Sequence, residues 1–162
     1  MARGLDLKCQ SLKTIDFSGF DTSSVTEFWL MFYGCSSLEA LDLSHFDTST
    51  LSSGSSLSMA DMFGNCTALK TADLSSFVTR EVKGMSGIFQ NCSNLETIYV
   101  GAGWSTSGFT RDDSDEDMFT GCSEKLTGGN GTKWSADNPT DKTYAKIDKA
   151  GQAGYLTLKQ TS

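Results

Sequence analysis

The chain repeats one phrase, whose clearest copy reads Cys35-Ser-Ser-Leu38-Glu-Ala-Leu41-Asp42-Leu43-Ser44-His-Phe46-Asp47-Thr48-Ser49. Further copies begin at Cys9 and Cys66, and a fourth, divergent copy begins at Cys92. From Cys9 to Cys122 the successive cysteines are 26, 31, 26 and 30 residues apart. A period of about 20 to 50 residues is typical of stacked repeats, in which each unit buries its apolar face only against its neighbours.

Each copy predicts a strand, a turn and a short helix. In the first copy Ile15 and Phe17 alternate with polar residues, as in a strand with one buried face. Residues 21–23 offer side chains that cap a helix start, and apolar residues recur at helical spacing over residues 25–32. Gly34 ends the predicted helix. We therefore expect an α/β repeat solenoid, with a parallel β-sheet on its concave side and short helices on its convex side.

Two sets of motifs carry a resemblance to known families. The spacing Leu-x-x-Leu-x-Leu resembles a leucine-rich repeat. The combination of Leu-Asp-Leu-Ser, Phe-Asp-Thr-Ser and Met-Phe-x-Gly-Cys resembles the BspA-like group of bacterial surface proteins over roughly residues 9–122. This resemblance implies a right-handed leucine-rich-repeat superhelix in a secreted or surface-attached protein that works in adhesion to host components or other cells. It implies no catalytic activity.

The chain length of 162 residues fits one domain with two parts. We expect residues 1–122 to form an array of about four units and residues 123–162 to form a C-terminal capping segment. Leu5-Asp6-Leu7 has the pattern of a strand but runs into Cys9 without the helix that the period requires. We therefore expect the array to be truncated at its N-terminal end.

Composition excludes several classes of partner. The net charge is −7, which argues against binding to nucleic acid, because that needs clusters of Lys and Arg. No stretch approaches the roughly 18 consecutive apolar residues of a membrane span, so we expect no membrane insertion. Together with the resemblance, these arguments leave an extracellular protein or glycan as the expected partner. We expect the chain to be a monomer.

The residue types and motifs that commonly serve in catalysis or cofactor binding do not indicate an enzyme or a cofactor site here. The one histidine, His45, lies in a predicted turn, and no phosphate loop, zinc motif or nucleophile motif surrounds it. We expect no enzymatic activity and no cofactor. The five cysteines are an odd number, which excludes a closed disulfide framework, and their common phase predicts small buried thiols in equivalent positions.

The strongest candidate for a binding surface is the strand face that points away from the core. Equivalent residues of neighbouring strands would stack there about 4.8 Å apart. Its predicted members are Thr14, Asp16, Asp42, Thr71, Asp73, Thr97 and Tyr99. Such a stripe could recognise a basic or hydroxyl-rich partner. In the alternative interpretation each aspartate bonds a turn amide or a hydroxyl of its own repeat.

Two further candidates lie in the irregular fourth unit. Trp104 is a candidate for a sugar-binding or protein-binding patch, and the alternative is that it seals the last repeats of the array. The acidic segment is a weak candidate for calcium, because that ion takes six to eight oxygen ligands. Its residues are Asp112, Asp113, Asp115, Glu116 and Asp117. The alternative is that they face the N-terminus of the next helix.

The sequence therefore favours a non-enzymatic binding module of a bacterial cell-surface or secreted protein, acting in adhesion. Two other functions stay open. The array could be a structural spacer that presents another domain, or it could be a weakly calcium-dependent, lectin-like module. The variation of the outward positions from Asp to Tyr, together with insertions in two of the units, favours binding over a spacer.

Overall fold

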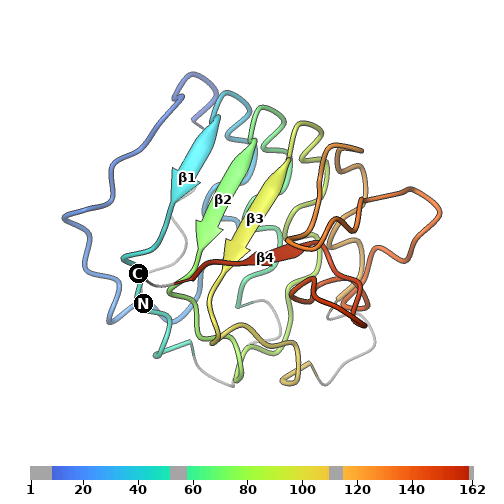
Figure 1. Cartoon of the computed structure of the whole chain (residues 1–162). Helices are drawn as coiled ribbons and strands as arrows, with labels where there is room; N and C mark the ends of the chain where they lie inside the picture. The colour runs from blue at the N-terminus through green and yellow to red at the C-terminus, as the bar shows by residue number, and fades with distance from the viewer. Residues whose placement is uncertain (1–8, 52–57, 110–114, 161–162) are drawn as a thin grey trace.

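The computed structural model describes residues 9–51, 58–109 and 115–160. Within these residues one parallel sheet has the strand order β1-β2-β3-β4 (Figure 1). Its strands are β1 (Ala40–Asp42), β2 (Thr71–Leu74), β3 (Thr97–Val100) and β4 (Leu156–Leu158). The strands β1, β2 and β3 come from successive repeats, and β4 comes from the C-terminal segment.

The expected α/β leucine-rich-repeat solenoid is wrong, because the described residues form no helix. The segments that we expected as convex helices are chains of tight turns. Residues 21–23, expected to cap a helix, form a turn in which the Ser23 amide donates to Asp21 Oδ1 at 2.9 Å. The sheet is therefore backed by stacked turns.

Two left-handed residues in each repeat explain the missing helices. One set lies two residues before the phenylalanine of the Met-Phe motif, with φ between 52° and 61°, and comprises Leu30, Asp61, Gly87 and Asp117. The other set lies two residues after it, with φ between 59° and 74°, and comprises Gly34, Asn65, Asn91 and Gly121. A right-handed helix cannot continue through a left-handed residue.

Backbone amides on the turn side alternate between two kinds of hydrogen bond. In the second repeat the amides of Asp61, Phe63 and Asn65 donate to carbonyls of the third repeat at 2.8 to 2.9 Å. Between them, the amides of Gly64 and Cys66 donate three residues back within their own turn, at 3.0 and 3.1 Å. A helix would make all these bonds internally. Here three of these five bonds hold one repeat to the next.

A column of stacked rings fills the core between the turns and the sheet. The rings of Phe32, Phe63, Phe89 and Phe119 follow each other at centroid distances of 5.6, 5.2 and 6.1 Å, with their planes within 13° of parallel. Tyr155 ends the column with an edge-on contact to Phe119 at 5.2 Å. These distances lie in the favourable range for aromatic pairs.

The cysteines form a second ladder beside the rings. Cys66, Cys92 and Cys122 are buried, and each thiol donates, at 3.0 to 3.3 Å, to the carbonyl of a phenylalanine that lies 29 to 34 residues earlier in the chain. Burial raises the pKa of the Cys66 and Cys122 thiols to about 12. None of the five cysteines forms a disulfide, and Cys35 is also buried, whereas Cys9 is half-buried. The predicted slots for buried thiols are therefore confirmed for the four cysteines from Cys35 onward.

Buried threonines form a third ladder next to the sheet. The Thr48 hydroxyl accepts from the amide of Val78 at 2.8 Å and donates to the carbonyl of the same residue at 3.3 Å. Thr22 and Thr79 make the same pair of bonds to the repeats that follow them. Each hydroxyl thus replaces one backbone pairing between two repeats.

The C-terminal segment covers the fourth repeat. Trp104 Nε1 donates to the Ala145 carbonyl at 3.0 Å, and Trp134 Nε1 donates to the Phe119 carbonyl at 3.1 Å. Asp148 is buried and its carboxylate accepts from the amides of Asn130 and Thr132 at 2.8 and 2.9 Å. The division into an array over residues 1–122 and a cap over residues 123–162 remains a prediction. No helix that could span a membrane occurs in the described part of the chain.

The first repeat is covered less completely than the others. Phe20 is 51 % exposed, whereas the equivalent Phe46 and Phe77 are 2 % and 0 % exposed. Leu12 is also exposed. The difference agrees with the rule that a repeat buries its apolar residues only between two neighbours.

Replacing a core leucine tests the register of the sheet. Leu74 is completely buried at the end of β2, so Leu74→Ala should lower the free energy of unfolding by about 2 to 5 kcal/mol. Val78→Ala, at a position that is 52 % exposed, is the matched control and should cost far less. Urea unfolding followed by circular dichroism measures both. Equal costs would show that Leu74 does not face the core.

A second variant tests the threonine ladder. Thr48→Val keeps the shape of the side chain but leaves the Val78 amide and carbonyl without their partner, so it should cost about 1 to 3 kcal/mol. Thr26→Val is the control, because Thr26 is exposed and its hydroxyl makes no hydrogen bond to a described residue. The same unfolding measurement applies. The ladder contributes nothing if the two variants have the same stability.

Candidate functional site

The outer face of the sheet carries two rows of aligned residues. In the first row Ala40 pairs with Thr71, which pairs with Thr97. In the second row Asp42 pairs with Asp73, Asp73 with Tyr99, and Tyr99 with Thr157. We call the residues Asp42, Asp73, Tyr99 and Thr157 the acidic row. The register is fixed on the other face by Leu41, Ala72 and Ile98, all of which are buried.

The members of the acidic row differ in exposure. Asp42 is exposed, Tyr99 is half-buried, and Asp73 is only 8 % exposed. Thr14 and Asp16, which we expected in the same stripe, are exposed but lie outside the strands. The first repeat meets β1 through the Glu39 amide, which donates to the Lys13 carbonyl at 3.1 Å. Beyond that bond it runs apart from β1 (Figure 1).

Each aspartate of the stripe also holds the turn that follows it. The Oδ1 atoms of Asp16, Asp42 and Asp73 accept from the amides of Ser18, Ser44 and Ser75 at 2.9 to 3.0 Å. These bonds lower the pKa of the Asp16 and Asp42 carboxyls. The alternative interpretation, in which each aspartate bonds a turn amide of its own repeat, is therefore confirmed. This hydrogen bond uses only Oδ1, so the second oxygen of each carboxylate is available to another partner.

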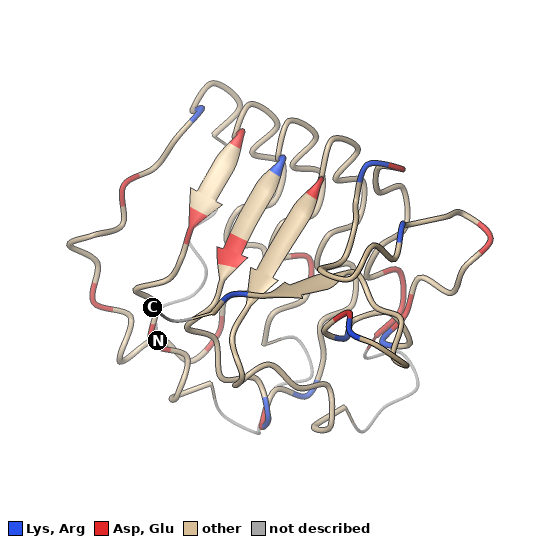
Figure 2. Ribbon diagram, viewed as in Figure 1, with Lys and Arg blue, Asp and Glu red and all other residues tan. Residues whose placement is uncertain are grey.

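Asp73 uses this second oxygen to bind a lysine that sequence reasoning missed. Lys159 follows β4, and its Nζ forms an ion pair with Asp73 Oδ2. The hydrogen bond to Asp73 raises the pKa of Lys159, and the nearby charges of Asp73 and Asp42 act in the same direction. Figure 2 shows the basic residue beyond the tip of β4, beside the acidic end of β2. Because Lys159 lies outside the repeats, no periodic signal marks it.

A pocket of about 410 Å³ lies next to this lysine. It is lined by Ser75, Gly101, Ala102, Leu158, Lys159 and Gln160. Gly101 allows the close approach of the third and fourth repeats, since a Cβ there would lie 2.1 Å from the Ser75 carbonyl oxygen. The residues that follow β2 and β3 and the chain at the end of β4 therefore line one pocket, and Lys159 connects this pocket to Asp73.

Charges at the opposite ends of the strands are arranged differently. Where β1, β2 and β3 begin, the ribbon is red, blue and red in Figure 2. Glu39 lies 3.3 Å from Lys13 and 3.8 Å from Lys70, and its neighbours along this line alternate in sign as far as Glu96. At this end the Glu39 carboxylate thus lies between lysines of both adjacent repeats. The acidic row contrasts with it, because Asp42 forms no ion pair with a described residue.

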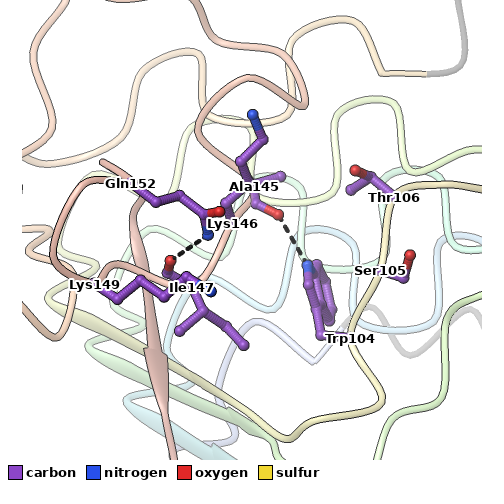
Figure 3. Close-up of a pocket in the computed structure, with 8 residues that line it drawn as sticks. All are labelled: Trp104, Ser105, Thr106, Ala145, Lys146, Ile147, Lys149 and Gln152. Carbon is purple, nitrogen blue, oxygen red and sulfur yellow. Dashed lines mark hydrogen bonds between the residues drawn. The ribbon is translucent and has the colours of Figure 1, made fainter.

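Trp104 lies away from the acidic row. It is 8 % exposed and occupies the position that Phe77 has in the third repeat. Figure 3 shows its ring at the wall of a pocket of about 270 Å³, with the indole nitrogen directed at the Ala145 carbonyl. The other lining residues are Ser105, Thr106, Ala145, Lys146, Ile147, Lys149 and Gln152. This placement supports the sealing role over the binding role.

The acidic segment shows no arrangement for a cation in its described part. Asp112 and Asp113 lie outside the described residues. Asp115 is buried and pairs with Lys142 at 3.2 Å, Glu116 is exposed, and Asp117 Oδ1 accepts from the Thr120 hydroxyl at 2.7 Å. The expected helix start is wrong, because turns follow. Over residues 9–51, 58–109 and 115–160 no three His, Cys, Asp or Glu side chains are grouped to hold a metal ion.

The chain is similar to one protein family. Residues 5–138 match the family described as "Mycoplasma protein of unknown function, DUF285". No curated protein and no solved structure matches the chain. These comparisons give no evidence for the BspA-like resemblance, which remains a prediction.

Acid should weaken the turns that the aspartates hold. Because the folded-state pKa of Asp42 and Asp47 is lowered by hydrogen bonds to Ser44 and Ser49, their contribution to stability is present above the unfolded value of about 3.9. It is lost as the pH falls through the folded value. Asp42→Asn/Asp47→Asn keeps the acceptor oxygens without the titration, so the loss of stability between pH 6.5 and pH 3 should be smaller than in the wild type.

Urea midpoints at the two pH values measure this difference. Asp137→Asn is the control, because this exposed carboxylate makes no hydrogen bond or ion pair with a described residue, and it should lose as much stability as the wild type. A double variant with the same acid sensitivity as the wild type would contradict the role of these carboxylates.

Proposed function

The chain belongs to the DUF285 family, and we propose that it is a non-enzymatic interaction module that binds a protein or glycan across the outer face of the sheet. The observation that carries the proposal is the acidic row. It places Asp42, Asp73 and Tyr99 side by side on three successive repeats, on the face of the sheet that points away from the core.

The row has the physical properties of a recognition surface. Neighbouring strands set its side chains about 4.8 Å apart, a spacing that suits the successive groups of an extended ligand. Asp73 is held on one oxygen by its own turn, so its carboxylate has little freedom to lose on binding. Tyr99 adds an aromatic ring with a polar tip, a residue type that is enriched where interfaces are most sensitive to mutation.

The setting of this activity rests on the resemblance to the BspA-like group. We propose a bacterial cell-surface or secreted protein that acts in adhesion to host components or other cells. The net charge of −7 favours partners with basic patches over anionic polymers.

Binding to a panel of purified extracellular-matrix proteins and glycans tests the proposal. For any ligand that binds, Asp42→Asn/Asp73→Asn/Tyr99→Ala should weaken the affinity at least about tenfold, a loss of about 1.4 kcal/mol. The asparagines keep the oxygens that accept from Ser44 and Ser75, so the turns should persist. Surface plasmon resonance measures the affinity, and circular dichroism checks the fold.

Asp21→Asn/Asp47→Asn is the matched control. These two aspartates hold the same kind of turn but lie outside the strands, and the variant removes the same number of charges. If the control and the row variant lose affinity equally, the overall negative charge of the chain accounts for the binding, and the acidic row is not the site. If no ligand binds at micromolar concentration, the module is a spacer that presents another domain.

A further inference from the structure

We propose that the acidic row binds a lysine or arginine side chain on an extended segment of a partner protein. In the absence of the partner, the chain's own Lys159 occupies the place of that side chain beside Asp73, and the partner displaces it. This inference rests on the proposed function and names the chemistry of its partner. It follows from the ion pair of Lys159, from the neighbouring Asp42 carboxylate, which forms no ion pair with a described residue, and from the pocket that Lys159 lines.

The first step is that an ammonium group already sits on the row. Lys159 Nζ contacts Asp73 Oδ2, while Asp73 Oδ1 accepts from the Ser75 amide at 3.0 Å. The carboxylate is therefore fixed in orientation, and its outer oxygen is presented to a cation. Asp73 is 8 % exposed, so its charge is costly to bury without such a partner. Lys159 shows which kind of group satisfies it.

The second step is that one lysine does not neutralise the row. Asp42 is the direct neighbour of Asp73 in the sheet, yet it forms no ion pair with a described residue. The row thus has two carboxylates and one ammonium, which pairs with Asp73, so the row keeps an excess negative charge. Tyr99 is the next member of the row after Asp73, and an aromatic ring can attract a lysine or guanidinium group. The surroundings therefore favour a further cationic side chain.

The third step is that the occupying segment is weakly held. The side chain of Lys159 is 45 % exposed, and Leu158 is 43 % exposed. After β4, the amide of Lys159 donates one more bond, to the Val100 carbonyl at 2.9 Å. The Lys159 end of the ion pair is therefore open to water, which weakens its hold on the segment. A partner segment of similar chemistry can compete with such a contact.

The fourth step is the space for the rest of a partner segment. The pocket of about 410 Å³ lies between the chain after β4 and the turn at Gly101 and Ala102. Its lining joins small residues to Leu158, so it can take an uncharged side chain next to the cationic one. Neutral glycans lack a cationic group, whereas a basic peptide segment offers both features. The partner is therefore a protein with an exposed basic segment.

Removing the internal lysine tests this inference. In Lys159→Gln the competitor is lost, so a ten-residue peptide of alternating Ser and Lys should bind about two- to fivefold more tightly than it binds the wild type. Lys125→Gln is the control, since it changes the net charge equally at an exposed lysine of the cap, and its affinity should equal that of the wild type. The corresponding Ser and Gln peptide should bind to none of them.

Amide chemical shifts in a nuclear magnetic resonance titration give both the affinity and the location. The shifts should move at Asp42, Asp73 and Tyr99, and Asp42→Asn/Asp73→Asn added to Lys159→Gln should abolish binding. Equal affinity of Lys159→Gln and the wild type, or shifts elsewhere, would overturn the inference. So would a response of these amides to calcium chloride but not to the peptide, because the row would then be a metal-ion site.

The two proposals fail in different ways. A ligand from the extracellular panel that needs the acidic row but ignores Lys159→Gln overturns only the lysine inference. If no member of the panel binds and the lysine peptide binds to no variant, both proposals are overturned.

Discussion

The hydrogen bonds between the turns of neighbouring repeats are the constraint on which the rest of the structure depends. An amide that donates to the next repeat, as Phe63 does to Ile88, cannot also close a helix within its own repeat. Stacking therefore replaces the helices, and it brings equivalent residues of successive repeats into line. The ring column, the buried thiols and the bridging threonines all follow from this one alignment.

The same alignment creates the candidate site. Strands of three or four residues would define a register only weakly by themselves, because a short pairing makes few hydrogen bonds. Here the ladders behind the sheet fix the register, so that Asp42 and Asp73 must lie side by side. Their mutual repulsion is offset by turn amides and by Lys159. The stability of the stack thus maintains a concentration of like charge that an isolated sheet would not favour.

The repeat period allowed β1, β2 and β3, the rows on their outer face and the buried cysteines to be predicted, whereas the strand expected around Ile15 and Phe17 in the first repeat is wrong. It did not reveal the turns behind the sheet, because Phe28, Met31 and Phe32 are buried in stacked turns as they would be in a helix. Gly34 and Asn65 signal left-handed backbone at one position of the repeat, but Leu30 gives no such signal at the other. Lys159 was missed because its contact with Asp73 is made across the fold, outside any repeat.

The most direct test of this account is a through-hydrogen-bond scalar coupling at the amide nitrogen of Phe63, measured by nuclear magnetic resonance. Stacked turns predict a coupling to the carbonyl carbon of Ile88, one repeat further along the chain. A convex helix predicts a coupling to the carbonyl carbon of Met59, four residues back. The first result would establish the alignment that builds the acidic row. The second would contradict the stack and the site derived from it.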